Sequence, residues 1–267
     1  MVNLLAKSKL HQSFRQAKKI RRHRRRLRRE GIEQCLVVSA YPKSGQTWVS
    51  RMVADAVGCE MVAYLSDANE RQPRESGLDL SELLDDVVVA RSHHTVDLLT
   101  LGGVKPDNIV SVVRDPRDIS VSGSGFLFAA DNVPSEERID QMIDQMVERQ
   151  RPDVRWQDMR WDDFVQSAIR RNVLMVRYTD LVRDTAGSLK KILTRLGYER
   201  SDEVIGRVVR FHNFDVSKAR AAANGRPDVH QYLRRGEPGA YRDFLTVRQQ
   251  ARIEGEFRQT MEYFGYL

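Results

Sequence analysis

The sequence predicts an α/β fold in which a central parallel sheet is flanked by helices. Short apolar runs, typical of strands buried on both faces, alternate with segments whose apolar residues recur at helical spacing. This alternation favours a parallel sheet covered on both sides. A length of 267 residues is enough for one sizeable domain of this kind. The strands are predicted at residues 36–40, 87–90, 109–113 and 173–176.

The helices are predicted from apolar periodicity and from capping residues. Gly58 and Gly197 each follow a periodic segment and are expected to end a helix, whereas Ser135 is expected to begin one. Two stretches that contain Gly and Pro, 64–79 and 224–241, are expected to be loops. The predicted helices span residues 47–57, 81–86, 119–128, 135–150, 161–169, 182–196, 202–211 and 247–263.

Positive charge is concentrated at the N-terminus. Residues 1–30 contain 12 Lys and Arg and one acidic residue, whereas the other residues contain 32 basic and 36 acidic side chains. We therefore predict a basic arm at 1–30 that is disordered, or helical only against an anionic partner, and a single α/β domain at 31–267. The arm is interpreted as a solvated tail, as a contact with an anionic membrane surface, or as a contact with RNA or DNA. Because the body is slightly acidic, nucleic-acid binding by the fold as a whole is not expected.

The remaining composition gives little sign of metal binding or secretion. Cys35 and Cys59 are too few for a disulfide framework or a metal-ligand cluster, and we expect both in the core. Uninterrupted apolar runs are too short for a transmembrane helix, and the N-terminus lacks the apolar segment of a secretory signal. We expect a cytoplasmic protein, with peripheral membrane association left open by the arm.

The stretch from Val37 to Trp48 predicts a phosphate-binding loop. An apolar strand leads into a turn with Lys43 and Gly45, and a helix follows. This geometry directs backbone N–H groups and the positive end of a helix dipole at an anion, and Lys43 adds a full charge. The nucleotide-triphosphatase pattern is absent, because the Lys precedes the only Gly. We therefore expect a P-loop-like nucleotide-binding core of another kind.

Tyr-Pro-Lys-Ser-Gly-Gln-Thr-Trp resembles the 5′-phosphosulfate loop of the PAPS-dependent sulfotransferases, whose usual form has Thr where this chain has Gln46. The resemblance implies PAPS as the donor and PAP as the product, with no metal. It implies a loop that binds the 5′-phosphate. Gln46 has no hydroxyl, so the side-chain contact that Thr makes in the family is not expected at this position. The loop residues concerned are Lys43, Ser44, Gly45, Gln46, Thr47 and Trp48.

A second motif, Arg114-Asp115-Pro116-Arg117-Asp118, follows the strand at 109–113. Taken alone, it is either a surface turn with ion pairs or a phosphate site, because the guanidinium fork of Arg matches phosphate oxygens. It resembles the 3′-phosphate motif of the same family, with Arg114 and Ser122 as the ligands.

Three further segments extend the resemblance to about residues 36–247. Residues 232–246 are similar to the family's Arg-Lys-Gly segment, which implies that Arg234, Arg235 and Gly236 close over the 3′-phosphate. Ala240 is the least conservative departure there. The segments around Tyr178 and Phe214 resemble those that contact adenine, and Trp48 is a third candidate for that pocket. His212 departs from the family pattern.

The resemblance also implies the catalytic groups. Lys43 is expected to stabilise the leaving phosphate oxygen. Arg91-Ser92-His93 aligns with the family's Lys-Thr-His, so His93 is expected to be the base that activates the acceptor, in keeping with the near-neutral pKa of imidazole. His94 is the local alternative, although alternation along a strand end directs it the other way.

The acceptor stays open as a small molecule, a glycan or a lipid. Residues 60–80 and 126–160 are expected to line its site, either with apolar side chains (Phe126, Phe128, Met142, Met146) or with basic ones (Arg149, Arg151, Arg155, Arg160). Dimerisation is also open, because Thr246-Val247 partly resembles a family dimer motif but Ala251 replaces its Glu. The alternative function is a non-catalytic PAP- or anion-binding interaction protein on this fold, tethered by its basic arm.

Overall fold

The computed structural model describes the whole chain except residues 1, 66–70, 73–82, 129–132, 149–158 and 224–235. The described residues form a six-stranded sheet in the order β3-β2-β4-β1-β5-β6. Five strands are parallel, and β3 pairs antiparallel with β2. The strands are β1 (Gln34–Ala40), β2 (Glu60–Val62), β3 (Arg71–Gln72), β4 (Val87–Ser92), β5 (Ile109–Val113) and β6 (Leu174–Arg177).

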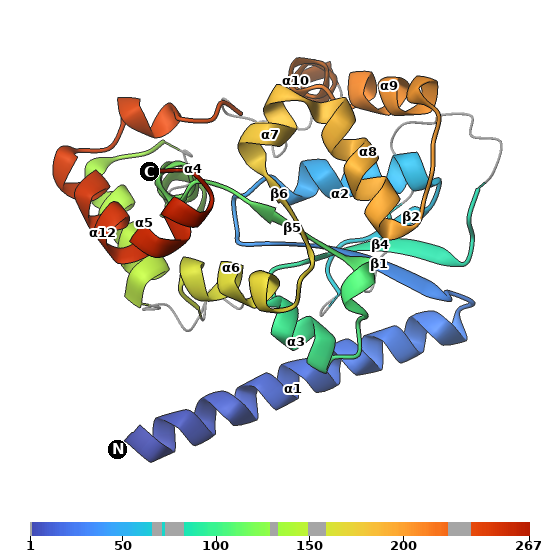
Figure 1. Ribbon diagram of the computed structural model, residues 1–267, viewed down its shortest axis with the longest axis horizontal. Coiled ribbons are helices and arrows are strands. Elements are labelled where there is room, and N and C mark those ends of the chain that lie inside the picture. The colour runs from blue at the N-terminus through green and yellow to red at the C-terminus, as the bar shows by residue number, and fades with distance from the viewer. Residues whose placement is uncertain (1, 66–70, 73–82, 129–132, 149–158, 224–235) are drawn as a thin grey trace.

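Helices connect these strands and cover both faces of the sheet (Figure 1). Two short 3₁₀ helices are η1 (Pro106–Asn108) and η2 (Ala240–Asp243). The α-helices are α1 (Val2–Arg29), α2 (Gln46–Val57), α3 (Val96–Leu101), α4 (Pro116–Phe128), α5 (Glu136–Glu148), α6 (Trp161–Arg170), α7 (Tyr178–Arg183), α8 (Thr185–Leu196), α9 (Asp202–Phe211), α10 (Phe214–Ala223) and α12 (Val247–Tyr263).

Alternate residues of β1 enter two different cores, as expected for a central strand buried on both faces. Leu36 and Val38 pack with α2, α8 and α9 on one face. Cys35 and Val37 pack with α1, α3 and α6 on the other. Both cysteines are free and buried, in agreement with the sequence prediction.

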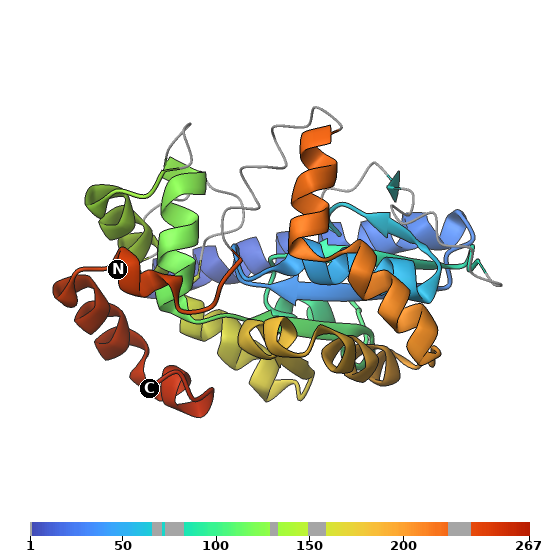
Figure 2. The same cartoon turned by 90° about the horizontal axis from the view of Figure 1, so that it is seen from above.

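A third core lies beyond one end of the sheet, where α4, α5, α6 and α12 pack together. Figure 2 shows α4, α5 and α12 at one end of the molecule and α8 and α9 at the other. Tyr41 and Val113 extend from the ends of β1 and β5 into this core. The core therefore begins where the strands finish and forms one wall beside their carboxyl ends.

The strand register brings the predicted motifs together. Ser39 pairs with Ser92 on one side of β1, and Ala40 pairs with Val112 on the other. Val113 in turn pairs with Arg177. The loops after β1, β4, β5 and β6 consequently leave the same edge of the sheet side by side, where open α/β sheets bind their ligands.

The predicted parallel sheet flanked by helices is confirmed, and the four predicted strands correspond to β1, β4, β5 and β6. The helix predicted at 81–86 is wrong in its described part, because residues 83–86 are not helical and lead directly into β4. Residues 81–82 lie outside the described part of the chain. The sequence reading missed β2 and β3, which are only three and two residues long, and the helices α3 and α10.

The N-terminal segment differs from the disordered arm that its charge predicts. Residues 2–29 form helix α1, and Ala17, Ile20 and Leu27 are buried on its inner side. The reason is that one face of the segment is apolar at helical spacing and packs with α3. The boundary of a single domain at residue 31 stays a prediction.

Candidate active site

The loop after β1 has the backbone geometry of an anion site. Lys43 and Gly45 both have left-handed conformations, with φ of 67° and 91°. Gly45 is the N-cap of α2, whose first turn contains no side-chain cap and no acidic residue. The N–H groups of this turn, together with the helix dipole, therefore present positive potential at the edge of the sheet.

Gly45 also allows a close approach by Tyr178, the first residue after β6. A Cβ atom at position 45 would lie 2.8 Å from carbons of the Tyr178 ring. The ring of Trp48 lies edge-on to the same tyrosine, with centroids 6.2 Å apart. Two of the aromatic residues proposed to contact adenine thus meet directly beside the loop.

Gln46 is turned inward. Its side chain is buried, and Nε2 donates hydrogen bonds to the carbonyl oxygens of Val38 and Ser92, at 2.8 and 2.6 Å. These carbonyls belong to β1 and β4, so the amide joins the two strands at the edge that carries the site. The contact expected from a Thr hydroxyl is replaced by a contact within the protein.

Arg114 lies over the Tyr178 ring, with Cζ 4.4 Å from the ring centroid. It donates one hydrogen bond to the carbonyl of Lys43, at 3.1 Å, and its Nε is 3.9 Å from a carboxylate oxygen of Asp118. Nε is buried and makes no hydrogen bond with the described residues. The guanidinium is therefore held beside the phosphate loop, and its Nε–H group is still available as a hydrogen-bond donor.

Three other polar side chains of the site differ in their burial and in their contacts. The Ser44 hydroxyl is buried and has no hydrogen-bond partner among the described residues. Thr47 is exposed, and its hydroxyl accepts a hydrogen bond from Arg91 at 3.1 Å. Ser122 is half-buried on α4, two turns beyond Arg114.

His93 follows β4 and points across to β1. Its Nδ1 lies 2.7 Å from the carbonyl oxygen of Ala40. Since a carbonyl only accepts, Nδ1 carries the proton and the lone pair of the neutral ring is on Nε2. Burial, together with the positive charges of Arg91 and Lys43, lowers the pKa of His93 to about 4, although the hydrogen bond to Ala40 acts in the opposite direction. The imidazole is therefore neutral at pH 7.

Tyr64 belongs to the same cluster. It lies within residues 60–80, which were expected to line the acceptor site, but it was not singled out from the sequence. Its ring centroid lies 5.5 Å from that of His93, and the Arg91 guanidinium lies over the Tyr64 ring, with Cζ 4.8 Å from the ring centroid. Arg91 also donates to the carbonyl of Ala63. A single Tyr in a polar stretch gives no sequence signal for this role.

Lys43 and His94 also lie at the sheet edge that carries the site. The Lys43 ammonium lies 4.1 Å from the centroid of the Phe126 ring on α4. His94 is buried, and its backbone accepts a hydrogen bond from Ser39. Between the two histidines, His93 is thus the more accessible one, as alternation along the strand predicts.

The aromatic group around Trp48 is fixed by a buried pair. Trp48 donates from Nε1 to the carbonyl of His212, and His212 Nε2 lies 2.6 Å from a carboxylate oxygen of Asp55 on α2. Two residues further on, Phe214 packs on Gly236, where a Cβ would lie 2.9 Å from its ring. His212, which departs from the family pattern, therefore acts in packing.

Gly236 is the one described residue of the predicted Arg234-Arg235-Gly236 segment, because 234 and 235 lie outside the described residues. Its carbonyl accepts a hydrogen bond from the Tyr178 hydroxyl at 2.8 Å. Asp118 accepts from the backbone N–H groups of Gly239 and Tyr241. The start of α4 and Tyr178 thus hold this C-terminal segment over the site.

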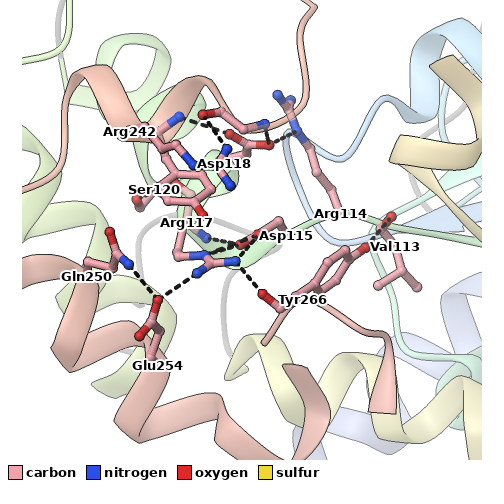
Figure 3. A network of polar contacts seen from close by, with 12 residues as sticks. Val113, Arg114, Asp115, Arg117, Asp118, Ser120, Arg242, Gln250, Glu254 and Tyr266 are labelled. Atoms are coloured by element: carbon pink, nitrogen blue, oxygen red, sulfur yellow. Dashed lines mark hydrogen bonds and ion pairs between the residues drawn. The ribbon is translucent and has the colours of Figure 1, made fainter. Parts of the chain in front are cut away.

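Arg117 has a structural position within the second motif (Figure 3). It contacts both carboxylate oxygens of Asp115, Glu254 on α12 at 2.6 Å, and the carbonyl of Tyr266. Burial opposes its charge, but the hydrogen bonds that Arg117 donates to Asp115 and Glu254 keep its pKa above the usual range. The motif therefore contains both a candidate phosphate ligand, Arg114, and a structural ion pair, which Arg117 forms in the protein interior.

Comparison with known proteins assigns this geometry to a family. The family model described as "Sulfotransferase domain" matches residues 33–265. The chain belongs to the sulfotransferase family. Sulfotransferase 1E1 of Cavia porcellus is 23% identical over 248 residues, which cover 85% of this chain and 83% of the relative. Sulfotransferase 1 family member D1 of Rattus norvegicus is also 23% identical, with the same coverage.

Solved structures show the same fold as this sulfotransferase. Mouse sulfotransferase SULT7A1, complexed with PAP, matches with a TM-score of 0.65 and 20% identity over 86% of this chain and 85% of that one. Retinol dehydratase in a complex with retinol and PAP matches with a TM-score of 0.59 and 18% identity, covering 85% and 81% of the two chains.

The residues expected to line the acceptor site of the sulfotransferase divide into three groups. Met142 and Met146 are buried in the core beside α4, and Arg160 forms ion pairs with Asp162 and Glu256. These three are therefore structural, and Phe126 remains near Lys43. Nothing is described of the Phe128 side chain, and Arg149, Arg151 and Arg155 lie outside the described residues.

Proposed function

We propose that this protein is a PAPS-dependent sulfotransferase that moves the sulfuryl group of PAPS to a hydroxyl or amine of a small-molecule acceptor. The observation that carries the proposal is the meeting of four loops at one sheet edge, with Lys43, His93, Arg114 and Tyr178 each just past a strand. These residues are up to 135 positions apart in the sequence, but the register of the parallel strands brings the loops that carry them side by side.

Two buried polar groups support the assignment of PAPS as the donor. Ser44 is in the loop assigned to the 5′-phosphate, and Arg114, whose Nε is 3.9 Å from Asp118, is assigned to the 3′-phosphate. The Ser44 hydroxyl and the Arg114 Nε are both buried and have no hydrogen-bond partner among the described residues. Buried polar groups of this kind are costly unless a ligand or water satisfies them. In our assignment the N–H groups of residues 44–47 and the side chains of Ser44 and Thr47 hold the 5′-phosphate.

The other donor contacts follow from the same arrangement. Arg114 and Ser122 hold the 3′-phosphate, with Arg234, Arg235 and the backbone of Gly236 closing over it. Trp48, Tyr178 and Phe214 are assigned to the adenine pocket. Trp48 lies edge-on to Tyr178, the Tyr178 hydroxyl donates to the carbonyl of Gly236, and Phe214 packs on Gly236. Gln46 contributes its backbone N–H while its side chain binds the two strands.

PAPS supplies a sulfuryl group attached to a phosphate that leaves as part of PAP. Lys43 neutralises the negative charge that develops on the leaving phosphate oxygen. Its ammonium lies in the loop that binds that phosphate, and Phe126 helps to hold it there. Arg91 lies next to both Thr47 and Tyr64 and is assigned to the transferring sulfonate.

His93 accepts the proton of the attacking hydroxyl at Nε2. The Ala40 carbonyl holds Nδ1 in its protonated form, so the ring presents its basic nitrogen to the opposite side. With a pKa of about 4, the free imidazole is neutral but weakly basic. The negative charge of the donor opposes the neighbouring cations and raises this pKa, so His93 becomes a stronger base when the donor is bound.

The test is transfer of labelled sulfate from PAPS to a panel of alcohols, phenols, glycans and lipids. Wild-type protein is expected to label at least one acceptor, while His93→Asn loses about 10²–10⁴-fold in kcat and still binds PAP. Transfer that persists in His93→Asn contradicts the assignment of the base. PAP binding without transfer to any acceptor points to a non-catalytic binding protein.

A further inference from the structure

The basic helix α1 is fixed to the body of the protein. Ile20 on its inner side lies against Gly102 so closely that a Cβ on the glycine would be 2.5 Å from the Ile20 side chain. Arg21 donates two hydrogen bonds to the carbonyl of Leu101, and Arg24 donates to that of Gly103. These carbonyls end α3, where cations are favoured, so α1 is docked by apolar and polar contacts together.

Docking of the inner side leaves a row of cations outside. Successive members are three, four, three and four residues apart, which places them along one line on a helix. We call this row the α1 stripe. Its members are all exposed and are Arg15, Lys18, Arg22, Arg25 and Arg29.

Within the described residues, none of the five stripe cations takes part in an ion pair. Glu30, the residue directly after the stripe, pairs with Arg26 beside it. Like charges at i,i+3 and i,i+4 repel each other and disfavour the helix. Attraction to an external anionic surface would offset that repulsion. The rest of the chain has 32 basic and 36 acidic residues, so it has no excess positive charge that would compete for the same surface.

We propose that the α1 stripe is a docking surface for an anionic phospholipid membrane, on which the helix lies flat. A straight stripe on a helix about 42 Å long can touch a planar surface with all its charges at once. Phe14 is 55% exposed and stands one turn before Lys18, on the same side. An exposed aromatic ring beside cations suits a lipid interface, and it has no partner on a duplex backbone.

The contact is peripheral. Within the described residues no helix combines the length and the apolar character needed to cross a bilayer. The protein would therefore bind reversibly, through charge and one aromatic ring, and salt would weaken it. This inference is independent of the proposed catalysis, because no residue of the stripe belongs to the site.

The experiment uses the full chain in co-sedimentation with vesicles of phosphatidylcholine, with and without roughly 30% phosphatidylserine. Binding is expected to the anionic vesicles alone and to fall as salt rises. Each Gln replacement in the stripe is expected to weaken binding about fivefold, so the variant with all five replaced does not sediment. Phe14→Ser is expected to weaken vesicle binding but leave binding to duplex DNA unchanged.

The matched control variant loses the same number of positive charges, but at positions outside the α1 stripe. Its five Gln replacements are at exposed residues in ion pairs on the body, at Arg170, Arg183, Lys190, Arg248 and Arg258. This variant is expected to bind vesicles like wild type. Equal loss in both variants, no preference for anionic vesicles, or displacement of vesicles by duplex DNA at equal phosphate concentration would overturn the proposal. Thermal melting confirms that each variant is folded.

Discussion

The Gln46 side chain donates a 2.6 Å hydrogen bond to the carbonyl of Ser92, the residue before His93. A second bond, to Val38, ties the same amide to β1. Through one buried side chain the phosphate loop is therefore joined to the strand end that carries the proposed base. A substitution of this side chain should therefore affect the position of His93 more than it affects donor binding.

Gln46→Ala is expected to destabilise the fold by about 2 kcal/mol, because two hydrogen bonds of about 1 kcal/mol each are lost. We also expect kcat to fall more than the affinity for PAP. Denaturant unfolding and steady-state kinetics measure the two effects. Gln166→Ala is the control, since that amide bonds to Thr260. An unchanged kcat in Gln46→Ala would show that the link has no influence on His93.

Arg114 is expected to distinguish PAP from adenosine 5′-monophosphate, which lacks the 3′-phosphate. Charge-assisted hydrogen bonds contribute about 1.5–3 kcal/mol. Arg114→Ala should therefore lose about 10–150-fold in PAP affinity and little in affinity for the monophosphate, as measured by ligand-dependent melting. Arg195→Ala, in an exposed ion pair with Asp107, is the control. Equal losses for both ligands would remove Arg114 from the 3′-phosphate site.

The pKa of His93 gives a test that does not require an acceptor. Burial lowers it to about 4 in the free protein. The ring is therefore neutral above that pH and takes up a proton as pH falls through about 4. Bound PAP places negative charge nearby and should raise the pKa. NMR titration of the His93 ring, assigned with His93→Asn, measures both values. An ordinary free pKa that PAP leaves unchanged would argue against the site.

Arg117 is expected to matter for stability more than for catalysis. Its side chain and that of Asp115 are both buried, and it also binds Glu254 (Figure 3). Arg117→Met leaves the Asp115 carboxylate without its partner, which costs about 3–5 kcal/mol. Denaturant unfolding should show this loss, with PAP affinity retained in the folded fraction. A variant as stable as wild type would mean that the pair adds nothing to folding.

The sequence predicted the central strands well, because β1, β4 and β5 are continuous apolar runs with few alternatives. Strands β2 and β3 were missed, since three and two residues are too few for a periodic signal. Helix α1 was interpreted as disordered because charge dominates its composition. Its docking depends on Gly102 and Gly103, about 80 residues away, which no local pattern reveals.

For the site, the motifs predicted which loops meet but not how their side chains turn. The inward direction of Gln46 depends on the carbonyl of Ser92, 46 residues further along the chain. Tyr64 acquires its place beside His93 through the pairing of β2 with β4. The tie between Asp118 and the backbone of Gly239 likewise exists only in the folded chain.

The proposed function depends above all on binding of the donor nucleotide at the sheet edge that carries Lys43 and Arg114. Calorimetric titration of the wild-type protein with PAP tests it most directly, with ATP and magnesium as the competing nucleotide. We expect saturable binding of one PAP per chain, little affinity for ATP with magnesium, and loss of PAP binding in the double variant Lys43→Ala/Arg114→Ala. Absence of PAP binding, or PAP binding that the double variant retains, would contradict it.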